Sequence, residues 1–350
     1  MKVVVDPDGD VLLVVGATQP NVSIQVSSKV LSLASKPFKV MFSQSFREGN
    51  ELVVSNGPYE ISLPDDDPDA MVTICKLIHH KDVAPEGSIV AMRSFSVATD
   101  KYDTLQACSL YGRAWLDLFC HNAEQRGAGT LSLAHFFQDC GNFKKVSRAL
   151  LARPQGIAQL RAVPEDATSI PESVIDALMT LRSSIEDHLS ENLQMPITKM
   201  VTEHTQNLVL RGNCNHQSTQ VCDYISELRR LHLWPVQPKH WDFDEVLSDL
   251  SEFRNESTSK KKLSLYDKYS KLRKYLLMRT GGLCLACVRA GDLHFGTDYG
   301  IVPEGMASRL TDSGWHFFNN FAVHYCEINE KLWKHTMISI TYHVSTLATY

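Results

Sequence analysis

The chain has 350 residues, which is enough for about two domains of ordinary size. Hydrophobic residues make up 43% of it and charged residues 21%, so the composition excludes a wholly disordered chain. Its 35 basic residues are outnumbered by 40 acidic ones, which argues against a chain dedicated to binding nucleic acid. No uninterrupted apolar run is long enough to cross a membrane, and we therefore expect no membrane contact.

The first residues and the cysteines indicate an intracellular protein. Asp6, Asp8 and Asp10 precede any long apolar stretch, and this pattern does not fit a secretory signal. The nine cysteines are therefore expected to be reduced thiols. We expect the protein in the nucleus or the cytoplasm.

Strand and helix patterns alternate over residues 1–80. Short β-branched or alternating segments predict strands, and Ser27 or Ser28, Pro37 and the acidic run before Pro68 are typical of helix starts. Apolar segments at 52–54 and 59–63 flank a turn at 55–58. The strand candidates include residues 3–5, 11–15 and 22–26.

From about residue 88 the apolar spacing is mainly helical. The last strong helix stops at Gly281-Gly282. Residues 291–350 are rich in aromatic residues but have weak periodicity, and we assign them no fold. Helical faces are predicted within 105–115, 174–189, 200–208, 221–228, 243–253 and 265–276.

Five blocks of sequence follow one another within residues 8–82. They are Asp10–Gly16, Ile24–Ser35, Phe38–Phe42, Phe46–Gly49 and Ile61–Asp67, followed by a helix to His80. In this order the blocks resemble the BTB/POZ domain in its fungal form. One departure is that Ser27-Ser28 precedes Lys29, where many members of the family have a histidine.

The resemblance implies both a fold and a function. The fold class is α+β, with a small mixed sheet flanked by helices and followed by a mainly α-helical region. The function is a protein–protein interaction platform, scaffold or adaptor without catalytic activity of its own. By family position, the interaction residues are Asp10, Met41, Phe42 and Phe46.

The resemblance also implies particular partners. Family members often self-associate, but those that exchange strands carry a helix and a strand before the first block. Only nine residues precede Asp10, with room for a strand but not for a helix, so we do not expect an exchanged dimer. Some members are cullin-3 ubiquitin-ligase substrate adaptors, which need a helical hairpin after the domain, and residues 88–150 are the candidate.

We expect four segments along the chain. They are a BTB/POZ-like domain at 8–82, a helical extension at 88–150, a helical C-terminal domain at 168–290 and a poorly defined tail at 291–350.

Cys284 and Cys287 form a Cys-x-x-Cys pair, the spacing with which two thiolates bind one zinc ion. Cys214 and His216 are the natural second half, with Zn–S distances of about 2.3 Å and Zn–N distances of about 2.0 Å. Four protein ligands leave no position for water, so the ion would be structural. The order of Cys214-Asn215-His216, Leu233-Trp234-Pro235 and Gly282–Cys287 is similar to that in the helical half of fungal BTB proteins.

Other interpretations of these residues stay open. Cys222 and His294 are alternative ligands. Cys284 and Cys287 are equally well explained as buried thiols that pack as small hydrophobic side chains, and less well as a redox pair. For the cysteines on predicted helical faces, we expect core packing; these are Cys75, Cys108, Cys120 and Cys140.

Charge is segregated between residues 242 and 279. An acidic stretch at 242–256 precedes a basic stretch at 260–279 that contains tyrosines. We favour an acidic helix packed against a basic helix, and a nucleic-acid-binding basic helix is the alternative. Enzyme motifs are not found: Gly127-Ala128-Gly129 is an isolated Gly-x-Gly without a preceding strand, and we predict no catalytic residues.

Overall fold

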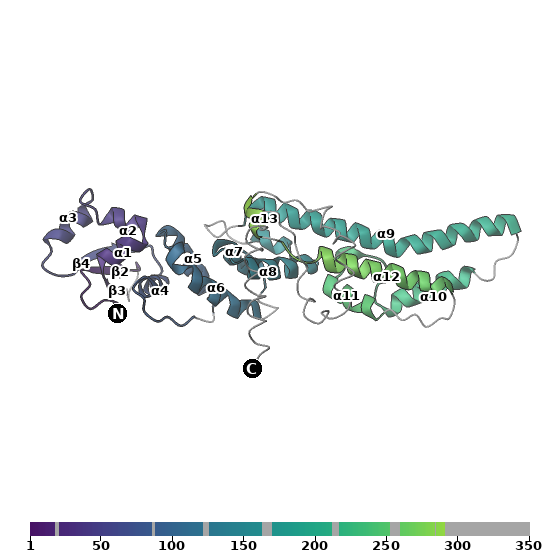
Figure 1. Cartoon of the computed structure of the whole chain (residues 1–350), viewed down its shortest axis with the longest axis horizontal. Helices are drawn as coiled ribbons and strands as arrows, with labels where there is room; N and C mark the ends of the chain where they lie inside the picture. Colours follow the sequence, from purple (N-terminus) through teal and green to yellow (C-terminus); the bar gives the residue numbers. More distant parts are fainter. Residues whose placement is uncertain are drawn as a thin grey trace, which may run out of the picture. The chain divides into compact units, whose positions relative to one another are not determined.

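The computed structural model describes residues 1–17, 21–85, 88–121, 126–162, 170–211, 217–252, 260–283 and 285–290. The chain divides into two compact units, Met1–Met179 (unit 1) and Thr180–Tyr350 (unit 2). Figure 1 labels the strands and helices along the chain. The predicted segments 8–82 and 88–150 both fall within unit 1, whereas the predicted segment 168–290 begins in unit 1 and continues in unit 2. The predicted tail at 291–350 lies outside the described residues. The described part therefore has the α+β composition that was predicted, with one small sheet and mostly helices.

Unit 1 begins with a four-stranded mixed sheet. Strands β1 (Lys2–Val4), β3 (Val22–Val26), β2 (Val11–Val15) and β4 (Tyr59–Leu63) lie side by side in this order. β2 and β3 are antiparallel, while β1 runs parallel to β3 and β4 runs parallel to β2. Leu13 pairs with Ile24 on one side and Ile61 on the other, and all three are buried. The β-branched run at 11–15 thus correctly indicated a strand, and in the structure every second residue of it is buried.

Helices follow β3 and β4. After β3 come α1 (Ser28–Ala34), α2 (Lys36–Met41) and α3 (Arg47–Val54). After β4 come α4 (Pro68–Ile78), α5 (Ile89–Lys101), α6 (Leu105–His121), α7 (Ala128–Phe136), α8 (Cys140–Ala152) and a short 3₁₀ helix at Ala158–Ala162.

Polar side chains cap α1 and α4, whose starts the sequence placed at Ser27 or Ser28 and at the acidic run before Pro68. The Ser27 hydroxyl accepts from the amide of Val30 and so caps α1, and the Asp67 carboxylate accepts from the amide of Ala70 and so caps α4. Pro37 lies in the first turn of α2, where its missing N–H removes no helical hydrogen bond.

Tyr102 and Asp66 join α5 to the layer formed by the sheet and the first helices. The buried Phe38 ring stacks on Tyr102 with a centroid distance of 4.5 Å, and the Ser35 hydroxyl donates to the Tyr102 carbonyl at 2.6 Å. The Tyr102 hydroxyl donates to Asp66 Oδ2 at 2.6 Å, and Lys101 Nζ lies 2.6 Å from Asp66 Oδ1. These contacts continue the packing of unit 1 beyond residue 82.

Unit 2 is helical in its described part. Helix α9 (Glu172–Arg211) starts in unit 1 and is followed by α10 (Gln217–Arg230), a 3₁₀ turn at Pro238–His240, α11 (Phe243–Ser251), α12 (Lys260–Arg279) and α13 (Leu285–Ala290). The prediction of separate helices at 174–189 and 200–208 is wrong, because α9 continues through Pro196. A single proline removes one backbone hydrogen bond, and here the helical turns on both sides of it persist.

Arg182 is a buried charge on α9 that contacts the segment at the start of α11. Its side chain is 7% exposed, its Nε donates to Glu186 Oε1 at 2.8 Å, and its Nη2 donates to the Trp241 carbonyl at 3.0 Å. The guanidinium also lies 4.4 Å from the centroid of the Phe243 ring. These contacts hold the start of α11 against α9.

The predicted contact between an acidic and a basic helix is present, because α11 packs against α12. Tyr269 of the basic helix is buried. Across the part of the chain that is described, no helix has the length and apolar character needed to span a membrane.

Candidate protein-interaction surface

The Asp10 carboxylate has a structural role. Asp10 directly precedes β2, and its two oxygens accept from the Ser28 amide at 2.8 Å and from the Ser28 hydroxyl at 2.6 Å. Asp10 therefore holds the start of α1 next to the sheet. Family position had suggested only an interaction role for this residue.

The other three predicted interaction residues lie where α2 ends and α3 begins. Met41 and Phe42 are half-buried, and the Phe42 ring stacks on the buried ring of Phe38 with centroids 5.7 Å apart. Phe46 precedes the first residue of α3 and is 46% exposed. The three predicted residues thus lie close together in the structure, at the α2–α3 turn, and Phe46 is the most exposed of them.

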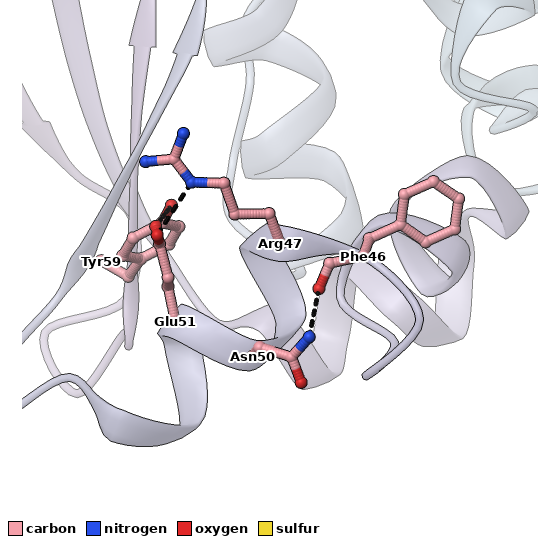
Figure 2. Close-up of polar contacts among 5 residues, drawn as sticks. All are labelled: Phe46, Arg47, Asn50, Glu51 and Tyr59. Carbon is pink, nitrogen blue, oxygen red and sulfur yellow. Dashed lines mark hydrogen bonds and ion pairs between the residues drawn. The ribbon is translucent and has the colours of Figure 1, made fainter.

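Two residues of α3 hold this turn in place. Asn50 Nδ2 donates to the Gln44 carbonyl at 2.9 Å. It also donates to the Phe46 carbonyl at 3.0 Å (Figure 2). Gly49 lies so close to the turn that a Cβ there would be 2.1 Å from the Ser43 carbonyl oxygen. Only glycine permits this approach, so the position of Phe46 depends on residues at 49 and 50.

The other side of α3 is tied to the sheet by a polar cluster of Arg47, Glu51 and Tyr59. Arg47 Nε donates to Glu51 Oε1 at 2.8 Å, and the Tyr59 hydroxyl at the start of β4 donates to Glu51 Oε2. These donors, the tyrosine first, lower the pKa of the Glu51 carboxyl, and the hydrogen bond to Glu51 raises the pKa of Tyr59. In Figure 2 the ring of Phe46 points away from this cluster.

No helix was predicted at 47–54, and two exposed residues were therefore missed. Val53 is 71% exposed and Val54 is 76% exposed, although both are β-branched apolar residues. Phe46 is the residue just before α3, and Val53 and Val54 are the last two residues of this helix. The spacing of Arg47 and Glu51, four residues apart, was a signal for this helix.

The zinc prediction is not tested by the described residues. Cys214, His216 and Cys284 lie outside them, as does the alternative ligand His294. Cys287 belongs to α13, of which the structure describes the backbone at that position. The site stays a prediction that elemental analysis of the full chain, purified without added metal and compared with the C284S variant, would test.

Of the five other cysteines that the structure describes, Cys75, Cys108 and Cys120 are buried. Burial raises the pKa of Cys75 to about 12 and the pKa values of Cys108 and Cys120 to about 11, so these thiols stay protonated and unreactive at neutral pH. The prediction that Cys140 packs in the core is wrong: it is exposed at the first position of α8, because the buried face of that helix begins with Asn142 and Phe143. In the part of the chain that the structure describes, no group of three or more His, Cys, Asp or Glu residues is arranged to hold a metal ion.

His79 borders a shallow hollow of about 570 Å³ that is lined largely by aliphatic side chains of α1 and α4. Its Nε2 accepts from the Ser27 amide at 3.1 Å, and its Nδ1 lies 2.8 Å from the Cys75 carbonyl. A ring that accepts at Nε2 must carry its proton on Nδ1, so His79 is neutral in this arrangement. Burial also lowers the pKa of His79. The His79–Ser27 bond ties the end of α4 to the cap of α1.

A second hollow, of about 540 Å³, lies in unit 2 between α9 and α12. Hydroxyl and acidic side chains line it together with His188, whose ring stacks on Tyr275 with centroids 3.8 Å apart. Burial lowers the pKa of His188. The His188 ring packs against α12 through Tyr275, and we assign it no role in acid–base catalysis.

Comparisons with known proteins give no relative of this chain. No protein-family model matches it, and no curated protein or solved structure gives a significant match. The function is therefore argued from the residues and their geometry.

Proposed function

We propose that this chain is a protein–protein interaction protein, a scaffold or adaptor without catalytic activity, and that residues 8–82 of unit 1 form a platform of the BTB/POZ type. Two features support the proposal. Unit 1 contains a small mixed sheet with helices after β3 and β4, as the sequence resemblance implies. The matching blocks also fall in order on consecutive elements: Asp10–Gly16 on β2, Ile24–Ser35 on β3 and α1, and Ile61–Asp67 on β4 and the cap of α4.

The observation that carries the proposal is the exposed aromatic ring of Phe46 on a fixed turn. Gly49 and Asn50 restrain the backbone on which the ring is mounted. An aromatic side chain on an ordered backbone contributes a large contact area and loses little conformational freedom on binding. Exposed rings of this kind, flanked by half-buried apolar residues such as Phe42, are typical of the central residues of interfaces.

A pair of matched variants of the full chain tests this surface. We expect the F46A variant to lose the proteins that the wild-type chain retains in affinity capture followed by quantitative mass spectrometry. The L118A variant is the control, because Leu118 is 58% exposed on α6, outside the α2–α3 turn. Equal capture by wild type, F46A and L118A would contradict a role for this turn.

A cullin-3 adaptor is the alternative within the same class. It is favoured by α7 and α8, which are consecutive, joined by residues 137–139 and packed against each other. Such a helical pair after the platform is what the resemblance implies for cullin-3 adaptors. Co-purification of the full chain with cullin-3 tests the alternative, and no association at micromolar concentration would exclude it.

A nucleic-acid-associated role through the basic helix is a proposal from a different class. Lys271, Arg273 and Lys274 are exposed on α12, whereas Leu272 and Leu276 between and beside them are buried. Three neighbouring cations on a helix can contact phosphates, and such binding weakens steeply with salt. Binding of duplex DNA or single-stranded RNA, measured at low and high salt, tests this role, and no binding at low salt would exclude it.

A further inference from the structure

The sequence contains a single Asn-Gly pair, Asn56-Gly57. It lies in the turn between α3 and β4, where every residue from 53 to 58 is exposed. Asparagine followed by glycine is the pair most prone to intramolecular cyclisation, because glycine has no side chain to hinder the approach of its own amide nitrogen.

The fold leaves the reacting groups of this pair unrestrained. The Gly57 amide donates only to the Ser55 hydroxyl, at 3.4 Å, which is at the long limit for a hydrogen bond. The Ser55 hydroxyl in turn donates to the Gly57 carbonyl at 2.6 Å. Among the described residues the Asn56 side chain has no hydrogen-bond partner, and the space around the Gly57 Cα is open. Asn56 can therefore turn its carboxamide toward the Gly57 nitrogen without breaking a strong contact.

A second pair that is chemically capable of cyclising, Asp8-Gly9, provides a contrast within the same unit. The Gly9 amide donates to the Asp6 carbonyl at 3.1 Å, and the Asp8 amide donates to Asp6 Oδ1 at 3.1 Å. A Cβ at Gly9 would lie 2.5 Å from the Val26 carbonyl oxygen, so this turn is packed against β3. The same local sequence chemistry is thus restrained at Gly9 and unrestrained at Gly57.

We propose that Asn56 is a site of spontaneous deamidation. The Gly57 nitrogen loses its proton to hydroxide and attacks Asn56 Cγ, forming a N–Cγ bond. The Cγ–Nδ2 bond breaks, and ammonia leaves after taking a proton from water, which regenerates hydroxide and leaves a five-membered succinimide. Water then adds to one ring carbonyl, one C–N bond breaks, and position 56 becomes an aspartyl or isoaspartyl residue. The net reaction consumes one water, releases one ammonia and involves no redox step.

The modification changes the connection between α3 and β4. It places a new carboxylate two residues after the exposed Val54 and three residues before Tyr59, which anchors α3 through Glu51. The isoaspartyl form also adds one backbone methylene to this short connection. The inference rests on the turn geometry alone and is independent of the proposed function.

The test uses the purified full chain, incubated at mildly alkaline pH and physiological temperature and followed by peptide mapping with mass spectrometry. Isoaspartyl residues are counted separately by enzymatic methylation. We expect the mass change of amide to carboxylate to accumulate at position 56, and to accumulate faster as the pH rises. The peptide that contains Asp8-Gly9 should gain no isoaspartyl residue over the same period.

The G57A variant is the matched control. A methyl group at position 57 meets no atom within 4 Å, and Gly57 is not among the residues with positive φ, so the fold should not change. The added methyl hinders the nitrogen, and we expect severalfold slower conversion of Asn56. The denatured wild-type chain gives the unrestrained rate. Conversion of the native chain much slower than this rate, or equal conversion in G57A, would overturn the proposal.

Discussion

Replacing Tyr102 with phenylalanine tests the idea that a buried hydrogen bond to Asp66 joins α5 to the sheet layer. Tyr102 is 3% exposed and the Asp66 side chain is 5% exposed, so the bond between them is shielded from water. A buried hydrogen bond to an acidic side chain contributes about 1.5–3 kcal/mol. We therefore expect Y102F to lower the free energy of unfolding by about 2 kcal/mol. The K101M variant should cost less than about 1 kcal/mol, because Lys101 is 49% exposed and water screens its ion pair.

Native-state hydrogen exchange of the full chain measures both effects locally, through the amides of α5. A second measurement is the free energy of unfolding at alkaline pH. Burial, followed by the hydrogen bond to Asp66, raises the pKa of Tyr102 above its ordinary value of 10.0. The folded state thus keeps a proton that the unfolded state loses, so stability falls as the pH rises above about 10, and Y102F should lack this part of the loss. A larger cost for K101M than for Y102F would refute the argument.

Three further predictions concern other contacts. In urea unfolding, the G49A variant should lower the free energy of unfolding by about 1–3 kcal/mol, because a Cβ at Gly49 would collide with backbone atoms. The G57A variant should leave it unchanged, because a Cβ at Gly57 meets no atom within 4 Å. Because burial lowers the pKa of His79 below 6.5, stability should be full above about pH 6.5 and fall below it; the H79Q variant should show less of this loss in acid titration. A thiol reagent should modify Cys140 in the native chain and Cys108 only after unfolding, as mass spectrometry of the labelled peptides would show.

The strands and helix starts of unit 1 could be predicted because their signals are local. The β-branched run at 11–15, the alternation at 22–26 and the apolar segment at 59–63 each coincide with a strand. The helix starts were found at Ser27 or Ser28 and at the acidic run before Pro68, and the structure assigns the two caps to Ser27 and Asp67. A cap needs only one side-chain oxygen two or three residues before an amide.

The contacts of Asp66 could not be predicted from local patterns. The acidic run at 65–67 was interpreted only as the favourable start of a helix, which is correct for Asp67. Asp66 instead turns inward and meets Lys101 and Tyr102, which lie 35 and 36 residues further along the chain. The spacing of residues within one segment carries no information about a partner so far along the chain. For this reason the domain was predicted to end at residue 82, although Asp66 contacts residues 101 and 102.

The interaction surface was only partly predictable, for a related reason. Periodicity shows which residues share a face of a helix, but not which face is turned inward. At α8 this is why Cys140 was wrongly predicted to be buried. At 52–54 the apolar residues gave no indication of exposure, although Val53 and Val54 are mostly exposed. What turns α3 outward is the close approach of Gly49 to the preceding turn and the anchoring of Glu51 by Tyr59. Exposed apolar residues of this kind become recognisable only when the tertiary contacts that orient their helix are known.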